Sequence, residues 1–130
     1  MKAILIVGLG GLIGSVARYK AGGWVLHHTV LERFPYSTFA VNVIGCFVAG
    51  VLAGLVEKYD FFTADTGLFL FTGLLGGFTT FSAFGLDAIY LVRHGELMTA
   101  ASYAALSVIL GIVAVWLGLR LIASWSQVHP

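Results

Sequence analysis

Polar side chains interrupt an apolar stretch between residues 73 and 85, where two threonines, a serine and four glycines accompany the phenylalanines. Gly76 and Gly77 weaken a helix at this point, and the hydroxyl groups of Thr79 and Thr80 can bond to the backbone groups that a break would free. Freed carbonyl oxygens in apolar surroundings can also coordinate a cation. The pattern predicts a helix broken at mid-membrane; the alternative is a continuous, glycine-rich packing helix.

Uncharged polar residues recur at helical spacing in two other apolar runs. Thr38 and Asn42 are four residues apart, so a helix places them on one face. Tyr103 and Ser107 have the same spacing, and Gly111 follows one turn later. Amide and hydroxyl groups can donate hydrogen bonds to an anion while they remain uncharged. These patterns indicate either a route for a dehydrated anion or interhelical hydrogen bonds worth about 0.6–2 kcal/mol.

Two aromatic and two charged residues complete the set of candidates. Phe81 and Phe84 share a helical face, and ring edges can attract a small anion, although the same spacing is common in packed helices. Arg18 lies well inside the first apolar run, where a lone charge costs about 2.5 kcal/mol or more, so we expect it either to face a water-filled vestibule or to snorkel to the membrane surface. Asp87 could pair with Arg18 or with a helix end, or it could titrate. No nucleophile–base pair or metal-ligand cluster is apparent, which argues against an enzyme.

The composition indicates where these residues lie. The 130 residues are 59% hydrophobic and only 10% charged, whereas a soluble domain is about 25% charged. Long apolar runs without alternation favour membrane helices over a barrel, so we expect an all-α membrane protein, residues 1–130 forming one domain in contact with lipid. The net charge of +1 gives no indication of a nucleic-acid partner. Cys46, the only cysteine, is interpreted as a small buried hydrophobe.

Four runs reach the length of about 20 residues that crosses a bilayer. They are predicted at residues 3–26, 38–56, 66–92 and 97–125. The basic residues then divide into Lys2, Lys58 and Arg120 on one side and Arg18, Lys20, Arg33 and Arg93 on the other. This near-equal division gives almost no positive-inside bias. Either another feature sets the orientation, or the protein inserts both ways, which we favour and which permits an antiparallel homodimer.

Glycines four residues apart occur in three of these runs. The pairs are Gly10 with Gly14, Gly50 with Gly54, and Gly73 with Gly77. Such pairs let two helix backbones approach closely in lipid. The first pair also lies in a stretch that looks like a dinucleotide-binding turn, but no alternation of strands and helices follows it, so we reject that interpretation.

Three segments together resemble a known family over nearly the whole chain. They are GGLIGSVARY at residues 10–19, NVIGCF at residues 42–47 and GGFTTFSAF at residues 76–84, of which the last is the most specific. The family is that of the Fluc/CrcB fluoride channels. The resemblance implies an antiparallel, dual-topology homodimer with two pores, and a structural sodium ion held by backbone carbonyls that map to Gly76 and Thr79.

The resemblance also assigns a pore. The predicted fluoride pore comprises Arg18, Thr38, Asn42, Phe81, Ser82, Phe84, Tyr103 and Ser107. The chain departs from the family pattern at Ala83, at Asp87 and at Gly111, where a third hydroxyl often completes the polar track. The last departure leaves the outer end of the track in doubt.

The expected function is passive export of fluoride across the cytoplasmic membrane, down its electrochemical gradient and without covalent chemistry. The main alternative is a proton-coupled small multidrug-type exporter, which also has four helices and dual topology. Such exchange needs a carboxylate within the membrane, usually in the first span. The first run contains none, and Asp87 is the only acid within any of the four predicted runs. A purely structural subunit would leave the buried Asn, Thr and Ser residues unexplained.

Overall fold

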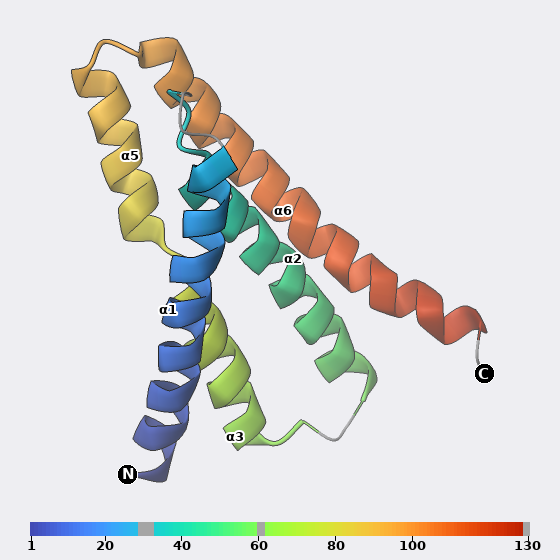
Figure 1. The fold of residues 1–130 in the computed structure, drawn as a ribbon. Helices are drawn as coiled ribbons and strands as arrows, with labels where there is room; N and C mark the ends of the chain where they lie inside the picture. Colours follow the sequence, from blue (N-terminus) through green and yellow to red (C-terminus); the bar gives the residue numbers. More distant parts are fainter. Residues whose placement is uncertain (29–32, 60–61, 129–130) are drawn as a thin grey trace.

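The computed structural model describes residues 1–28, 33–59 and 62–128, and within these ranges every regular element is a helix. The elements are α1 (Lys2–His28), α2 (Tyr36–Lys58), α3 (Ala64–Gly67), η1 (Leu68–Leu75), α4 (Gly76–Phe78), α5 (Phe81–Arg93) and α6 (Leu97–Val128). The elements α3, η1, α4 and α5 follow one another as one bent span, and the first residues of α1 lie at the same end of the bundle as the last turn of α6 (Figure 1).

Four helical spans have the length and hydropathy needed to cross a membrane. They are Lys2–His28, Tyr36–Lys58, Ala64–Arg93 and Leu97–Ser124. The four predicted spans are therefore confirmed to within one helical turn. Large apolar side chains such as Leu12, Ile112 and Trp116 are exposed on the outside, as expected for surfaces that contact lipid.

Glycines, rather than large apolar residues, form the contact between α1 and the first half of the third span. A Cβ atom added at Gly73 would lie 2.9 Å from the Cα of Gly10, and one added at Gly77 would lie 2.6 Å from the carbonyl oxygen of Gly11. A Cβ at Gly14 would overlap a carbonyl oxygen of η1. The predicted small-residue packing is therefore confirmed, because any larger side chain would force these backbones apart.

The helices α2 and α6 form the other close pair in the bundle. Gly50 lies directly against the backbone of Val115, and a Cβ at Gly54 would lie 3.0 Å from the Cβ of Ile122. Gly118 makes the reciprocal contact with the backbone of α2. These contacts bring the polar residues of α2 and α6 close to one another.

The third span is broken, but not at the glycine pair. Gly76 has helical dihedral angles (φ −62°, ψ −35°), whereas Thr79 (φ −84°, ψ 157°) and Thr80 (φ −150°, ψ 113°) are extended. The predicted interruption of this span is thus confirmed, and it lies at Thr79 and Thr80, just after the glycine pair. Glycine lowers helix stability without ending a helix, and Gly77 serves the contact with α1 instead. The helix ends here because the backbone N–H and carbonyl of Thr80 bond to the side chain of Asn42 instead of to helical partners, whereas the N–H of Thr79 still bonds to the carbonyl of Leu75.

The break changes the neighbour of the third span. Before it, η1 and α4 pack along α1; after it, α5 packs against α6 (Figure 1). The widened turns of η1 precede the break, where the N–H of Gly76 bonds to the carbonyl of Phe71, five residues back. The extended residues therefore lie where the third span passes α2 on its way from α1 to α6.

Candidate functional site

A cavity of about 270 Å³ lies beside the break in the third span, between α2, α5 and α6. We call it the central cavity. Its lining consists of Asn42, Cys46, Thr79, Thr80, Phe81, Phe84, Ser107 and Val108. All eight residues are uncharged, and five of them carry a polar hydroxyl, amide or thiol group. The cavity therefore offers neutral hydrogen-bonding groups and aromatic rings to a small solute.

Asn42 holds the break open. Its Oδ1 accepts a hydrogen bond from the backbone N–H of Thr80 at 2.8 Å, and its Nδ2 donates to the carbonyl oxygen of the same residue at 3.1 Å. The hydroxyl of Thr80 caps α5 by accepting from the N–H of Ala83 at 3.2 Å. The amide of Asn42 thus replaces the helical bonds that an extended residue loses, and it retains a second N–H for another acceptor.

Two backbone carbonyl oxygens beside the break lose their usual helical partners. In a continuous helix the carbonyls of Gly76 and Thr79 would accept from the N–H groups of residues 80 and 83. The N–H of Thr80 instead bonds to Asn42, and the N–H of Ala83 bonds to the hydroxyl of Thr80. Both carbonyl oxygens are therefore released from the helical ladder at the point where the chain is extended.

Three aromatic rings form a row from the surface of the bundle to its core. The ring centroids of Phe81 and Phe84 are 5.5 Å apart, and those of Phe84 and Tyr103 are 5.1 Å apart. Phe81 is 83% exposed, whereas Tyr103 is completely buried. The central cavity consequently has one wall of ring faces and edges, and this wall begins at the outer surface of the chain.

The hydroxyl of Ser107 is buried and, among the described residues, has no hydrogen-bond partner. Leaving a buried hydroxyl unsatisfied costs about 1–3 kcal/mol, so such a group in a cavity wall is available to a bound solute. One turn earlier, the hydroxyl of Tyr103 donates to Oδ2 of Asp87 at 3.4 Å and interacts with the Thr38 side chain. The hydroxyls of Tyr103 and Ser107 therefore have different surroundings: the first is hydrogen-bonded, and the second has no partner in the described part of the chain.

A match to a known family covers most of the chain. Residues 5–119 match the family described as CrcB-like protein, Camphor Resistance (CrcB). The chain belongs to the CrcB-like family. It is 50% identical over 127 residues to a protein of Methylobacillus flagellatus named "Fluoride-specific ion channel FluC", covering 98% of this chain and 99% of that relative.

Two further relatives carry the same name. The protein of Rhizobium etli is 50% identical over 121 residues, covering 93% of this chain and 96% of the relative. The protein of Flavobacterium psychrophilum is 43% identical over 119 residues, covering 92% of this chain and 95% of the relative.

The residues predicted for the pore of this CrcB-like chain fall into different places. Four of them, Asn42, Phe81, Phe84 and Ser107, line the central cavity. Arg18 and Thr38 line a separate cavity of about 190 Å³ together with Gly22, Ser37, Val41, Thr80 and Ala83. Ser82 is exposed at the surface, and its hydroxyl lies 3.2 Å from that of Thr80. Tyr103 is buried between Phe84 and Phe34.

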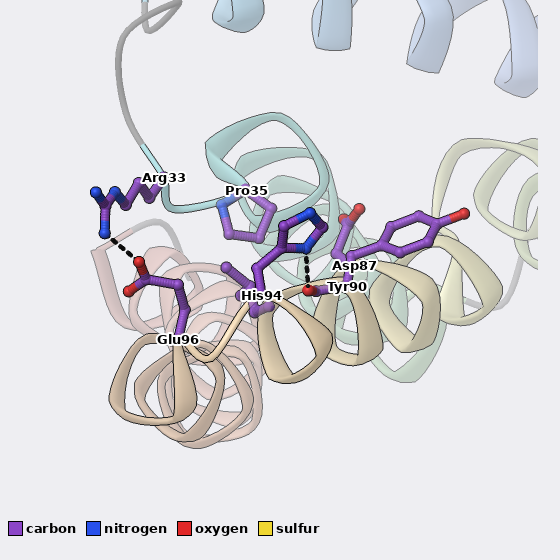
Figure 2. Close-up of a pocket in the computed structure, with 7 residues that line it drawn as sticks. Arg33, Pro35, Asp87, Tyr90, His94 and Glu96 are labelled. Carbon is purple, nitrogen blue, oxygen red and sulfur yellow. Dashed lines mark hydrogen bonds and ion pairs between the residues drawn. The ribbon is translucent and has the colours of Figure 1, made fainter.

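A third cavity of about 590 Å³ lies at the end of the CrcB-like bundle where α5 meets α6 (Figure 2). We call it the Asp87 cavity; it is lined by Arg33, Pro35, Asp87, Tyr90, Leu91, His94 and Glu96. Arg33 and Glu96 form an ion pair at its rim. Nδ1 of His94 lies 2.7 Å from the carbonyl oxygen of Tyr90, and because a carbonyl only accepts, this nitrogen carries the hydrogen.

Two interpretations of individual side chains need correction. The pairing of Asp87 with Arg18 that the sequence allowed is not formed, because the two residues line different cavities and Asp87 accepts from Tyr103. Cys46 is not a buried filler: it is partly exposed and lines the central cavity. Its spacing of four residues from Asn42 was the available signal, since both then lie on one face of α2.

Proposed function

We propose that this protein is a fluoride-selective channel of the cytoplasmic membrane, through which fluoride leaves the cell passively. Relatives that match nearly the full length of the chain bear the name "Fluoride-specific ion channel FluC". The observation that carries the proposal is the buried, unpaired hydroxyl of Ser107 in a cavity with an uncharged lining. Neutral donors can replace part of the hydration shell of a small anion without binding it too tightly for release.

The residues of the central cavity would act together on the dehydrated ion. Ser107 would donate its unpaired hydroxyl, and Asn42 would donate the amide hydrogen that Thr80 does not use. The rings of Phe81 and Phe84 would present their electropositive edges. Because none of these groups is ionised, the anion would be stabilised only in part and could move on to the next group.

Other polar residues would extend this route beyond the central cavity. Arg18 and Thr38 line a common cavity, where the positive charge would raise the local concentration of anions. Tyr103, whose ring packs against that of Phe84, and the exposed Ser82 would add further hydroxyl groups.

The exposure of Phe81 supports a homodimer. Phe81 lines the central cavity although 83% of its surface is exposed, so the cavity reaches the outside of a single chain. An anion route that opened directly onto lipid would be unfavourable, because charge in hydrocarbon costs several kcal/mol. A second copy would close it, and the near-equal division of basic residues supports an antiparallel, dual-topology arrangement with two pores.

A structural sodium ion fits the oxygen atoms at the break. The carbonyls of Gly76 and Thr79 have lost their helical donors, and hard cations prefer oxygen ligands. We propose that these carbonyls of both subunits hold the ion at the dimer centre, where its charge would offset the crowded oxygen dipoles. The bond between Asn42 and Thr80 keeps the chain extended there and so keeps these carbonyls available.

Anion efflux from liposomes that contain the purified protein tests the proposed function. A fluoride electrode and a parallel chloride electrode record release after an ionophore is added to balance charge. We expect rapid release of fluoride but not of chloride, with no requirement for a proton gradient, and no release from protein-free liposomes. Absence of fluoride release, or equal release of chloride, would contradict the proposal.

Asp87 leaves a second candidate, the proton-coupled exporter. This carboxylate lies within the third span, lines a large cavity and bonds to a fully buried tyrosine. Release that required an imposed proton gradient, in the same liposomes, would favour this function over a channel.

A further inference from the structure

The row of polar groups on α6 ends at Gly111. Tyr103, Ser107 and Gly111 follow one another at intervals of four residues, and the first two carry hydroxyl groups. Gly111 is buried and has no side chain to continue the row. An anion that leaves Ser107 along this face of α6 would therefore meet no side-chain donor from α6 at the next turn.

The helix α2 fills the space that Gly111 leaves. A Cβ atom added at Gly111 would lie 3.4 Å from Sγ of Cys46, the nearest atom that the described residues of the other helices bring to that position. Cys46 also lines the central cavity together with Ser107, whose hydroxyl is buried and unpaired among the described residues. Sulfur therefore occupies the position to which a side chain of residue 111 would point.

The neighbours of Cys46 on α2 explain why its thiol faces α6. The adjacent Gly45 lies against the side chains of Phe78 and Thr79 at the break, so that side of α2 is occupied. Asn42, one turn before Cys46, lines the same cavity. The cavity is thus bordered by polar groups from two helices: Asn42 and Cys46 on α2, and Ser107 on α6.

We infer that the thiol of Cys46 is a specificity-determining donor of the anion path, which takes from α2 the place of a third hydroxyl on α6. The inference rests on the proposed fluoride channel. A thiol is a weak, uncharged hydrogen-bond donor with a polarisable sulfur, so it can contact a passing anion without holding it. The anion path would then leave the polar face of α6 after Ser107 and continue along Cys46 of α2, beside Gly111.

Four variants test the inference by fluoride efflux from liposomes. Cys46→Ala removes the donor and is expected to slow efflux about fivefold, the effect of losing one weak hydrogen bond. Cys46→Ser restores a donor on α2 and is expected to conduct faster than Cys46→Ala. The double variant Cys46→Ala with Gly111→Ser moves the donor to α6, and it is also expected to conduct faster than Cys46→Ala. Ile44→Ala, which shortens a lipid-facing side chain of the same helix, is expected to leave efflux unchanged.

The outcomes separate this inference from the function on which it rests. Wild-type protein that releases no fluoride would refute the proposed channel and the inference with it. Conducting wild-type protein with an equally fast Cys46→Ala variant would refute the inference alone. So would a double variant no faster than Cys46→Ala, provided that gel filtration and thermal unfolding show both to be folded.

Labelling of the single cysteine supplies a readout that does not depend on flux. Methyl methanethiosulfonate is small, and intact mass measures its addition to Cys46 of the purified protein. Fluoride is expected to slow the reaction, whereas chloride at the same concentration is not. A fluoride ion that occupies the site beside the thiol excludes the reagent, so equal reaction rates in both salts at a saturating fluoride concentration would overturn the inference.

Discussion

The central cavity and the Asp87 cavity differ in charge, although the buried Tyr103 connects their surroundings. The central cavity has eight uncharged lining residues, whereas the Asp87 cavity holds two acids, an arginine and a histidine. The central cavity is the smaller, at about 270 Å³ against about 590 Å³. We interpret the first as the region that dehydrates and selects the ion and the second as a hydrated mouth.

The difference in charge between the two cavities matters because water screens charges in one of them and not in the other. In a hydrated mouth, charges are screened by water and salt, so acids and bases can coexist with little effect on a passing ion. In a narrow, water-poor cavity the same charge would either trap or exclude an anion, because the effective dielectric constant is low. The comparison predicts that substitutions in the central cavity change fluoride flux strongly and that substitutions in the Asp87 cavity change it little.

Asn42→Asp is expected to have the largest effect. The new carboxylate would repel an anion about 5 Å away by about 3 kcal/mol at an effective dielectric constant of ~20, which corresponds to a loss of about a hundredfold in flux. It would also lose the amide donor to the carbonyl of Thr80, which lowers the stability of the break. Fluoride efflux measures the first effect, and the midpoint of thermal unfolding measures the second.

Asn42→Ser serves as the matched control for this prediction. It removes the amide, and with it the contacts to Thr80, without adding charge. We therefore expect a similar loss of thermal stability and a smaller loss of flux than for Asn42→Asp. Equal flux in the two variants would show that charge in this cavity does not decide conduction, and the comparison between the cavities would fail.

Phe81→Ile is expected to reduce fluoride flux about tenfold, because an aliphatic side chain has no electropositive edge to contribute. The folded chain should tolerate the change, since the side chain is 83% exposed in a single copy. Phe47→Ile, at an exposed position of α2 outside the central cavity, is the control and should conduct as wild type does. Unchanged flux in Phe81→Ile would remove this ring from the path.

The number and limits of the spans could be predicted because they depend on local composition. A run of about 20 apolar residues needs no partner to be recognised as a membrane helix. The contact of α1 with the third span could be predicted in kind from the glycine pairs, for example Gly73 and Gly77, since small residues at this spacing have few other uses in lipid. Both features are properties of short segments of sequence.

The partner that ends the helix at the break and the position of Cys46 beside Gly111 could not be predicted in this way. Each depends on residues that are distant in sequence. Asn42 bonds to Thr80, 38 residues later in the chain, and Cys46 of α2 lies against Gly111 of α6. Only the packing of α2 against α6 and the third span brings these residues together. The polar stripe on α2 did indicate Asn42, but it could not show that its partner is the backbone.

Asp87→Asn tests the Asp87 cavity and is expected to have a modest effect. Removal of one negative charge near the mouth should raise fluoride flux by about twofold to fivefold at low salt, and less at high salt. The hydroxyl of Tyr103 keeps an acceptor, because the amide oxygen of asparagine replaces Oδ2. Efflux is measured with and without a proton gradient, and Glu57→Gln at the opposite end of the bundle is the control for charge. A variant that stops transporting would instead identify Asp87 as a coupling acid.

Arg33→Gln should have the smallest effect of the series. Arg33 pairs with Glu96 at the rim of the Asp87 cavity, and its side chain is 78% exposed, so water and salt already screen its charge. We expect a loss of less than about 1 kcal/mol in stability and at most about a twofold loss of flux at low salt, which disappears at high salt. Efflux measured over a range of potassium gluconate concentrations tests this, since gluconate is too large to compete in the pore. A tenfold loss that persists at high salt would mean that the rim itself selects the ion, because only a poorly hydrated contact escapes screening. The division between a hydrated mouth and a dehydrating central cavity would then have to be abandoned.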